Sequence, residues 1–139
     1  MAVKTFDLTF RTKGNNDTVD ITDSVRGFVE KSGITEGMAT VFVPGSTGGV
    51  TTIEYEPGVV SDLSDLLDKL IPRGSHYKHD LAWGDGNAHS HMRAAVIGPS
   101  LSVPISGGSL KLGTWQQIVF IDFDNRSRSR RITVQVIGE

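Results

Sequence analysis

Apolar and polar side chains alternate at the start of the chain, where Phe6, Leu8 and Phe10 are separated by polar residues. This two-residue period is typical of a strand with one buried and one wet face. Runs of β-branched and aromatic residues between turn signals predict further strands. They lie at 38–43, 50–55, 92–97, around Val103, at 110–112, and at 117–123 and 131–137.

Two segments carry apolar side chains at helical spacing instead. Residues 22–33 form one such segment and end at Gly33, while residues 57–70 form another between Pro57 and Pro72. Glycine just past a helix and proline at its first turn are common boundary signals. The pattern therefore predicts two amphipathic helices.

Residues 73–87 show neither period and are punctuated by glycines. We therefore expect a long irregular loop here, and loops of this length often carry function. The remaining elements amount to two helices and about seven or eight strands, mostly joined by links too short for a parallel crossover. The sequence thus predicts one α+β domain over 1–139, a mostly antiparallel β-sheet or sandwich with two helices packed on one side.

Composition narrows the possible functions. Fourteen basic and sixteen acidic residues give a formal charge of -2, so there is no positive field that would favour nucleic acid. The chain has no cysteine, which excludes disulfides, thiolate metal sites and cysteine nucleophiles. The N-terminal segment lacks a secretory pattern, and no apolar run reaches the roughly 18 residues of a membrane span. We expect a cytoplasmic protein that binds neither nucleic acid nor membrane.

All four histidines fall within sixteen positions, at 76, 79, 89 and 91. If the segment is extended, His89 and His91 project from the same face and can share one cation, with His79 as a third ligand. Zinc suits three imidazoles best. The alternatives are solvated loop histidines, or proton transfer without a metal.

Two carboxylates flank this region in the sequence. Glu54 ends a predicted strand and Asp62 begins a predicted helix, and either can complete a metal shell or orient an imidazole. An ordinary helix cap or an exposed acid is the alternative for both residues.

The basic residues Arg126, Arg128, Arg130 and Arg131 form a cluster. The first three share one face if the segment is a strand, and guanidinium groups bind phosphate in bidentate fashion. A charged edge strand that discourages edge pairing is the alternative. The cluster predicts a local phosphate pocket rather than a nucleic-acid stripe.

Three stretches, 87–91 (NAHSH), 112–116 (LGTWQ) and 122–128 (DFDNRSR), resemble the YjbQ family in order and spacing, the last of them its archaeal branch. The resemblance implies a small α+β protein that assembles as a homotrimer. Some members of the family are associated with a secondary thiamine-phosphate synthase activity. That reaction joins hydroxymethylpyrimidine diphosphate to thiazole phosphate with loss of pyrophosphate.

By this resemblance His79, His89 and His91 are the family's histidine positions, Asp62 its helix acid and Glu54 the acid that closes its strand. One departure stands out. Members often carry His-Thr-Thr or His-Thr-Ser before the strand that ends at Glu54, where this chain has Gly-Ser-Thr at 45–47. A missing imidazole there would alter the chemistry.

The leading functional hypothesis is an enzyme that acts on a small phosphorylated substrate. Arg126, Arg128 and Arg130 would bind phosphate, and Gln116 would orient the substrate. The three histidines would hold a divalent ion or move protons, with zinc favoured by the ligands and magnesium by the synthase reaction. The alternatives are a non-catalytic homotrimer that binds a metal or ligand, and a metal-assisted hydrolase.

Overall fold

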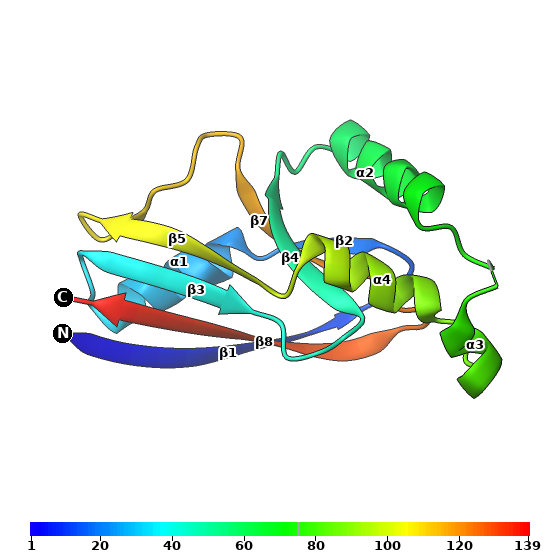
Figure 1. Cartoon of the computed structure of the whole chain (residues 1–139). Coiled ribbons are helices and arrows are strands. Elements are labelled where there is room, and N and C mark those ends of the chain that lie inside the picture. The colour runs from blue at the N-terminus through cyan, green and yellow to red at the C-terminus, as the bar shows by residue number, and fades with distance from the viewer. Residues whose placement is uncertain (75) are drawn as a thin grey trace.

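The computed structural model describes residues 1–74 and 76–139, and shows an α+β domain with both termini side by side at one end (Figure 1). Eight strands and four helices are found in these residues. In chain order they are β1 (Ala2–Thr12), β2 (Asp17–Asp20), α1 (Thr22–Ser32), β3 (Gly37–Phe42), β4 (Gly48–Ile53), α2 (Pro57–Leu70), α3 (Lys78–Trp83), α4 (Ala88–Ile97), β5 (Ser100–Ser106), β6 (Ser109–Leu110), β7 (Gln117–Asp122) and β8 (Arg128–Gly138).

The strands form two antiparallel sheets. One has the order β1-β8-β3-β5-β6 and the other β2-β7-β4. The long β1/β8 ladder runs from Ala2 opposite Gly138 to Thr12 opposite Arg128, so the start of β8 lies at the end of the sheet remote from the termini. The predicted fold class, α+β with a mostly antiparallel sheet, is confirmed.

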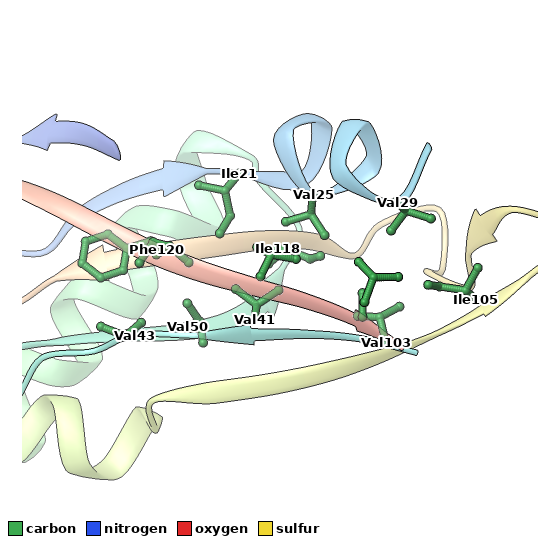
Figure 2. Close-up of a cluster of buried hydrophobic side chains, with 14 of the residues drawn as sticks. Ile21, Val25, Val29, Val41, Val43, Val50, Val103, Ile105, Ile118 and Phe120 are labelled. Carbon is green, nitrogen blue, oxygen red and sulfur yellow. The ribbon is translucent and has the colours of Figure 1, made fainter. Parts of the chain in front are cut away.

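The main core lies between α1 and the strands that face it (Figure 2). Val25 and Val29 of α1 are buried and point toward Val41 and Ile118, which are also fully buried. The ring of Phe28 adds a stacked contact with Phe6 of β1, with centroids 4.8 Å apart. These are the apolar positions whose spacing predicted the helix and the first strand.

Strand β7 is buried on both faces. Phe120 faces the main core, whereas Val119 and Ile121 face a second cluster completed by Leu67 of α2 and Ala94 of α4. A strand covered on both sides reads as a continuous apolar run rather than an alternating one. The expectation of two helices on one side therefore needs correction: there are four in the described residues, and α1 and α2 serve different clusters.

The strand predicted at 92–97 is wrong, because residues Ala88–Ile97 form helix α4. Its buried side chains recur at helical spacing but belong to Ala88, His89, Ser90, Arg93 and Ala94, so few of them register as apolar in the sequence. Helix α3 likewise lies inside the segment predicted to be irregular, and β2 was not predicted. None of the helices in the described residues is long and apolar enough to cross a membrane.

Candidate functional site

A cleft of about 710 Å³ opens at the end of the five-stranded sheet where β8 begins. Residues 43–47 between β3 and β4 form one wall, and Asp85, Asn87 and His91 form another. Residues 128–131 of β8, which include three arginines, line the floor. We call this space the arginine cleft. It brings together two of the sequence signals, the histidine segment and the basic strand.

Arg130 is held by a buried network behind the cleft. Its Nε and Nη2 donate to the two carboxylate oxygens of Asp122, each at 2.7 Å, and Nη2 also donates to Thr47 Oγ1 at 2.9 Å. Asp122 is fully buried and accepts a further hydrogen bond from Thr12. Because two of its three nitrogens are bound, the guanidinium is fixed in one orientation.

Arg128 is paired in the same way with Asp124, through Nη1 and Oδ2 at 2.6 Å. The Asp124 side chain is 3% exposed and the Arg128 side chain 37%, so the cation reaches the cleft while the anion lies behind it. Thr47 Oγ1 also donates to Asp124, at 3.2 Å. Each of these two arginines is therefore paired with a buried carboxylate, so their positive charges are partly balanced by Asp122 and Asp124.

Both carboxylates are ionised at neutral pH. Burial raises the pKa of Asp122, but the hydrogen bonds from Arg130 and Thr12 outweigh it and leave the pKa below its usual value. Burial also raises the pKa of Asp124, and the bonds from Arg128 and from the backbone of Asn125 likewise bring it below the usual value. The Asp–Arg pairs are therefore charged at the pH at which a phosphate would bind.

Arg126 differs from the other predicted phosphate ligands. It is exposed, precedes the first residue of β8 and does not line the arginine cleft. Its expected place on one strand face with Arg128 and Arg130 is therefore wrong. Arg131, which is on the outward face of the strand, is among the residues that line the cleft, whereas Arg126 is not.

His79 and His91 come together beside the cleft. Their ring centroids are 4.7 Å apart in an edge-to-face arrangement. His79 Nε2 lies 3.1 Å from Asn87 Oδ1 and 3.4 Å from Asp85 Oδ1. Both neighbours are acceptors, which favours a proton on Nε2 and an imidazole oriented by two side chains. This arrangement can supply a proton donor and acceptor at the rim of the cleft.

His89 points away from this pair. Residues two apart on a helix are about 200° apart around its axis, so the expected shared face of His89 and His91 is wrong. His89 is 2% exposed, its Nε2 lies 3.4 Å from Ser90 Oγ, and its Nδ1 has no hydrogen-bond partner in the described residues. Over residues 1–74 and 76–139, no group of three His, Asp or Glu side chains is arranged to hold a metal.

The buried His89 is expected to make stability depend on pH. Burial lowers its pKa, and repulsion from Arg93 and Arg73 lowers it further. Below pH 6.5, the ordinary pKa of histidine, His89 takes up a proton in the unfolded chain but stays neutral in the folded protein. The free energy of unfolding therefore falls as the pH drops through this range.

Urea unfolding at about pH 7.5 and about pH 5.5 measures the fall in the free energy of unfolding between the two pH values. We expect this fall to be smaller in a His89→Gln variant. The exposed His76 provides a matched control, since His76→Gln should keep the wild-type loss. An unchanged loss in His89→Gln would contradict the assignment.

Three predicted catalytic residues lie outside the cleft. Glu54 and Asp62 are exposed, at the end of β4 and on α2. Gln116 accepts from the Gly113 backbone at 2.8 Å and donates to Thr52 Oγ1 at 3.4 Å, within a separate hollow. The structure therefore does not bring them to the arginines and histidines.

Asp85 and Thr47 are site residues that the sequence reasoning did not single out as ligands or catalysts. Asp85 lies between Gly84 and Gly86, which have φ angles of 70° and 65° in the left-handed region that glycine favours. An acid between two such glycines was the available signal. Thr47 offered none, because its role depends on Arg130 and Asp124 arriving from distant strands.

Comparison with known proteins covers the whole domain. The model of the family described as "UPF0047 protein YjbQ-like" matches residues 6–139. A UPF0047 protein of Archaeoglobus fulgidus is 38% identical over 131 residues, 94% of this chain and 99% of that protein. One from Methanothermobacter thermautotrophicus is 40% identical over 139 residues, 100% of this chain and 95% of that protein.

Solved structures agree with these matches. A YbjQ-like protein of unknown function from Sulfolobus solfataricus superposes with a TM-score of 0.90 at 34% identity, covering 99% of this chain and 100% of that one. A protein of the yjbq/upf0047 family from Clostridium acetobutylicum gives 0.88 at 38% identity, covering 95% and 99%. The similarity extends over the residues that line the arginine cleft.

Proposed function

Because this chain belongs to the YjbQ-like UPF0047 family, we propose that it is an enzyme that acts on phosphorylated small molecules in the arginine cleft. The observation that carries this proposal is the placement of Arg128, Arg130 and Arg131 with His91 around one space of about 710 Å³. Guanidinium groups that are already held in place lose little side-chain conformational entropy when they bind phosphate oxygens.

Thiamine-phosphate synthesis is the specific reaction that the sequence resemblance implies. In it a thiazole nitrogen attacks the methylene carbon of the pyrimidine, the carbon–oxygen bond breaks, and the electron pair leaves with pyrophosphate. Negative charge grows on the leaving oxygens, where Arg128 and Arg130 would stabilise it. His91 would donate a hydrogen bond or a proton to the departing group, with its neighbour His79 held by Asn87 and Asp85.

The predicted metal ligands do not fit a single ion, because His89 is turned into the protein while His79 and His91 meet at the cleft. We therefore derive no catalytic step through a metal. The carbon–nitrogen bond of the synthase reaction forms without one in this scheme, and the arginines provide the charge stabilisation.

Phosphate binding and turnover test the proposal together. We expect Arg128→Ala to weaken pyrophosphate binding, measured by calorimetry, by about tenfold to a hundredfold, because one hydrogen bond to a charged group contributes about 1.5–3 kcal/mol. Synthase turnover from the two substrates should fall by at least as much. Arg126→Ala is the control, since this exposed arginine lies outside the cleft and should keep wild-type binding.

Equal losses in the Arg126 and Arg128 variants would mean that the cleft is not the phosphate site. Because Arg128 also pairs with the buried Asp124, each variant is compared with wild type by circular dichroism and thermal unfolding first. Arg131→Ala, which breaks no pair with a buried acid in the described residues, gives a second measure of the same site.

A second candidate function is a non-catalytic metal-binding homotrimer. Its support is the close approach of His79 and His91, whose ring centroids are 4.7 Å apart and which offer two imidazoles to a zinc or magnesium ion. The zinc content of the purified protein, measured beside the synthase assay, separates the two candidates. Stoichiometric zinc without turnover would favour metal binding over catalysis.

Homotrimer formation is common to both candidates. Its support is an exposed apolar row on the outward face of the five-stranded sheet, where Ile137 pairs with Val3 on one side and Met38 on the other. These side chains are 41%, 53% and 42% exposed. Apolar rows of this kind are typical of subunit contacts. Analytical ultracentrifugation of the purified wild-type protein should give a mass three times the 15.0 kDa of one chain. The mass of a single chain would exclude the trimer.

A further inference from the structure

Gly45 occupies a position that does not require glycine. Its φ lies outside the left-handed region, and a Cβ built there would meet only Arg130 Nη1, at an ordinary contact distance of 3.6 Å. Gly48 and Gly49, by contrast, would bring a Cβ to 2.6 Å from the Phe120 ring and 2.9 Å from Ile97. Neither backbone strain nor packing therefore accounts for the absence of a side chain at position 45.

The missing side chain leaves one nitrogen of Arg130 uncovered. Nε and Nη2 are bound to Asp122 and Thr47, whereas Nη1 makes no hydrogen bond in the described residues and lies next to Gly45. Both Gly45 and Arg130 line the arginine cleft. Because the buried carboxylate fixes the guanidinium plane, its two Nη1 protons stay available to an acceptor that enters past Gly45.

A second, smaller space meets the cleft at the same point. It has a volume of about 250 Å³ and is lined by Gly48, Ala94, Ala95 and Pro99, together with Gly45, Ser46 and His91, which also line the cleft. We call it the apolar hollow. Its walls are small side chains from α4 and from the turn that follows it, so it suits a compact apolar group and offers few polar partners.

We propose that Gly45 is a specificity-determining position that joins these two spaces, and that the site takes a phosphomonoester with a compact apolar or aromatic group. The phosphate accepts from Arg130 Nη1 and Arg128, and the apolar group enters the hollow beside Ala95 and His91. This inference rests on the proposed function and deepens it, because it names the shape of the ligand and the residue that admits it. A side chain at position 45 would cover Nη1 and narrow the passage.

Calorimetric titration with two probes, inorganic phosphate and phenyl phosphate, tests the inference. Wild-type protein should bind phenyl phosphate about tenfold more tightly than phosphate, because the ring removes apolar surface from water in the hollow. Gly45→Ala should weaken phenyl phosphate binding by about tenfold or more, which corresponds to the loss of one charge-assisted hydrogen bond.

Two further variants make the result specific. Ala95→Leu fills the hollow and should weaken phenyl phosphate binding while leaving inorganic phosphate unchanged. Gly27→Ala is the matched control, because it adds a methyl group in α1 where nothing lies within 4 Å of the new Cβ and outside the lining of both spaces. It should bind both probes as the wild type does.

The outcomes separate this inference from the proposed function. If wild-type protein binds neither probe, the proposed function fails. If the wild type binds both probes and Gly45→Ala binds each of them as tightly as the wild type does, the cleft is still a phosphate site, but position 45 does not determine its specificity. Equal affinity of the wild type for the two probes, or an unaffected Ala95→Leu variant, would mean that the hollow does not accept part of the ligand.

Discussion

Replacing Arg130 by alanine is expected to lower the free energy of unfolding by about 3–5 kcal/mol, the usual effect of removing one partner from a buried ion pair. The reason is the carboxylate left behind. Asp122 is fully buried, and Arg130 supplies two of its hydrogen bonds at 2.7 Å. Without the guanidinium, this carboxylate must remain charged without its main partner or take up a proton. Equilibrium unfolding in urea measures the change.

Arg131→Ala is the matched control for this variant, because Arg131 is exposed on the next residue of the same strand and should change stability little. A double variant with Asp122→Asn should lose less than the sum of the two single losses, since no unpaired charge then remains. A loss below about 1 kcal/mol in Arg130→Ala would show that the pair does not hold this end of the sheet.

Replacing Arg93 by alanine should lower the free energy of unfolding by about 2–4 kcal/mol, from an unsatisfied carbonyl and a cavity together. Arg93 is 1% exposed although it lies on α4. Its Nε and Nη2 donate to the Ile71 carbonyl at 3.1 and 2.8 Å, at the end of α2, and Nη2 also donates to Asp68 at 2.9 Å. Nη1 reaches Asn16 Oδ1 at 3.0 Å. One side chain thus ties α4 to α2 and to the segment before β2.

Arg26 offers the comparison, since its pair with Asp23 is exposed on α1, where ion pairs contribute little. Urea unfolding of Arg26→Ala should match the wild type. Arg93→Met restores most of the volume but not the hydrogen bonds, so it should recover only part of the loss. Full recovery in Arg93→Met would mean that packing, rather than the Ile71 carbonyl, accounts for the effect.

Arg93 and Arg130 both use guanidinium nitrogens to hold distant parts of the fold together. Arginines often indicate phosphate binding, yet the three nitrogens of Arg93 donate to residues of the fold itself, and Arg130 uses two of its three nitrogens to support the site. Within the described cleft, this leaves the remaining nitrogen of Arg130, the part of Arg128 that is not paired with Asp124, and Arg131 at the edge of the cleft. A count of basic residues therefore overstates the phosphate-binding capacity.

Local periodicity was sufficient for β1 and α1 but not for β2, α3 or α4. The alternation around Phe6 and the spacing of Val25 and Val29 each correspond to a buried face, so β1 and α1 were predicted correctly. The same reasoning failed for α4, where burial falls on His89 and Arg93. The burial of Arg93 depends on hydrogen-bond partners that the tertiary structure supplies, and those partners, Ile71 and Asp68, are 22 and 25 positions away in the sequence.

The amino-acid sequence by itself determined the α+β class, the antiparallel strands and the segments that carry the chemistry, because burial of apolar faces follows local periods of two and 3.6 residues. Only the tertiary structure decided which of those side chains meet. Asp122 forms a buried ion pair with Arg130, and the turn of helix α4 places His89 and His91 on different faces. Gly45 lies beside the guanidinium of Arg130, 85 positions away in the chain. Such contacts depend on strand register and helix rotation, which are set by the whole core and cannot be derived from any one segment.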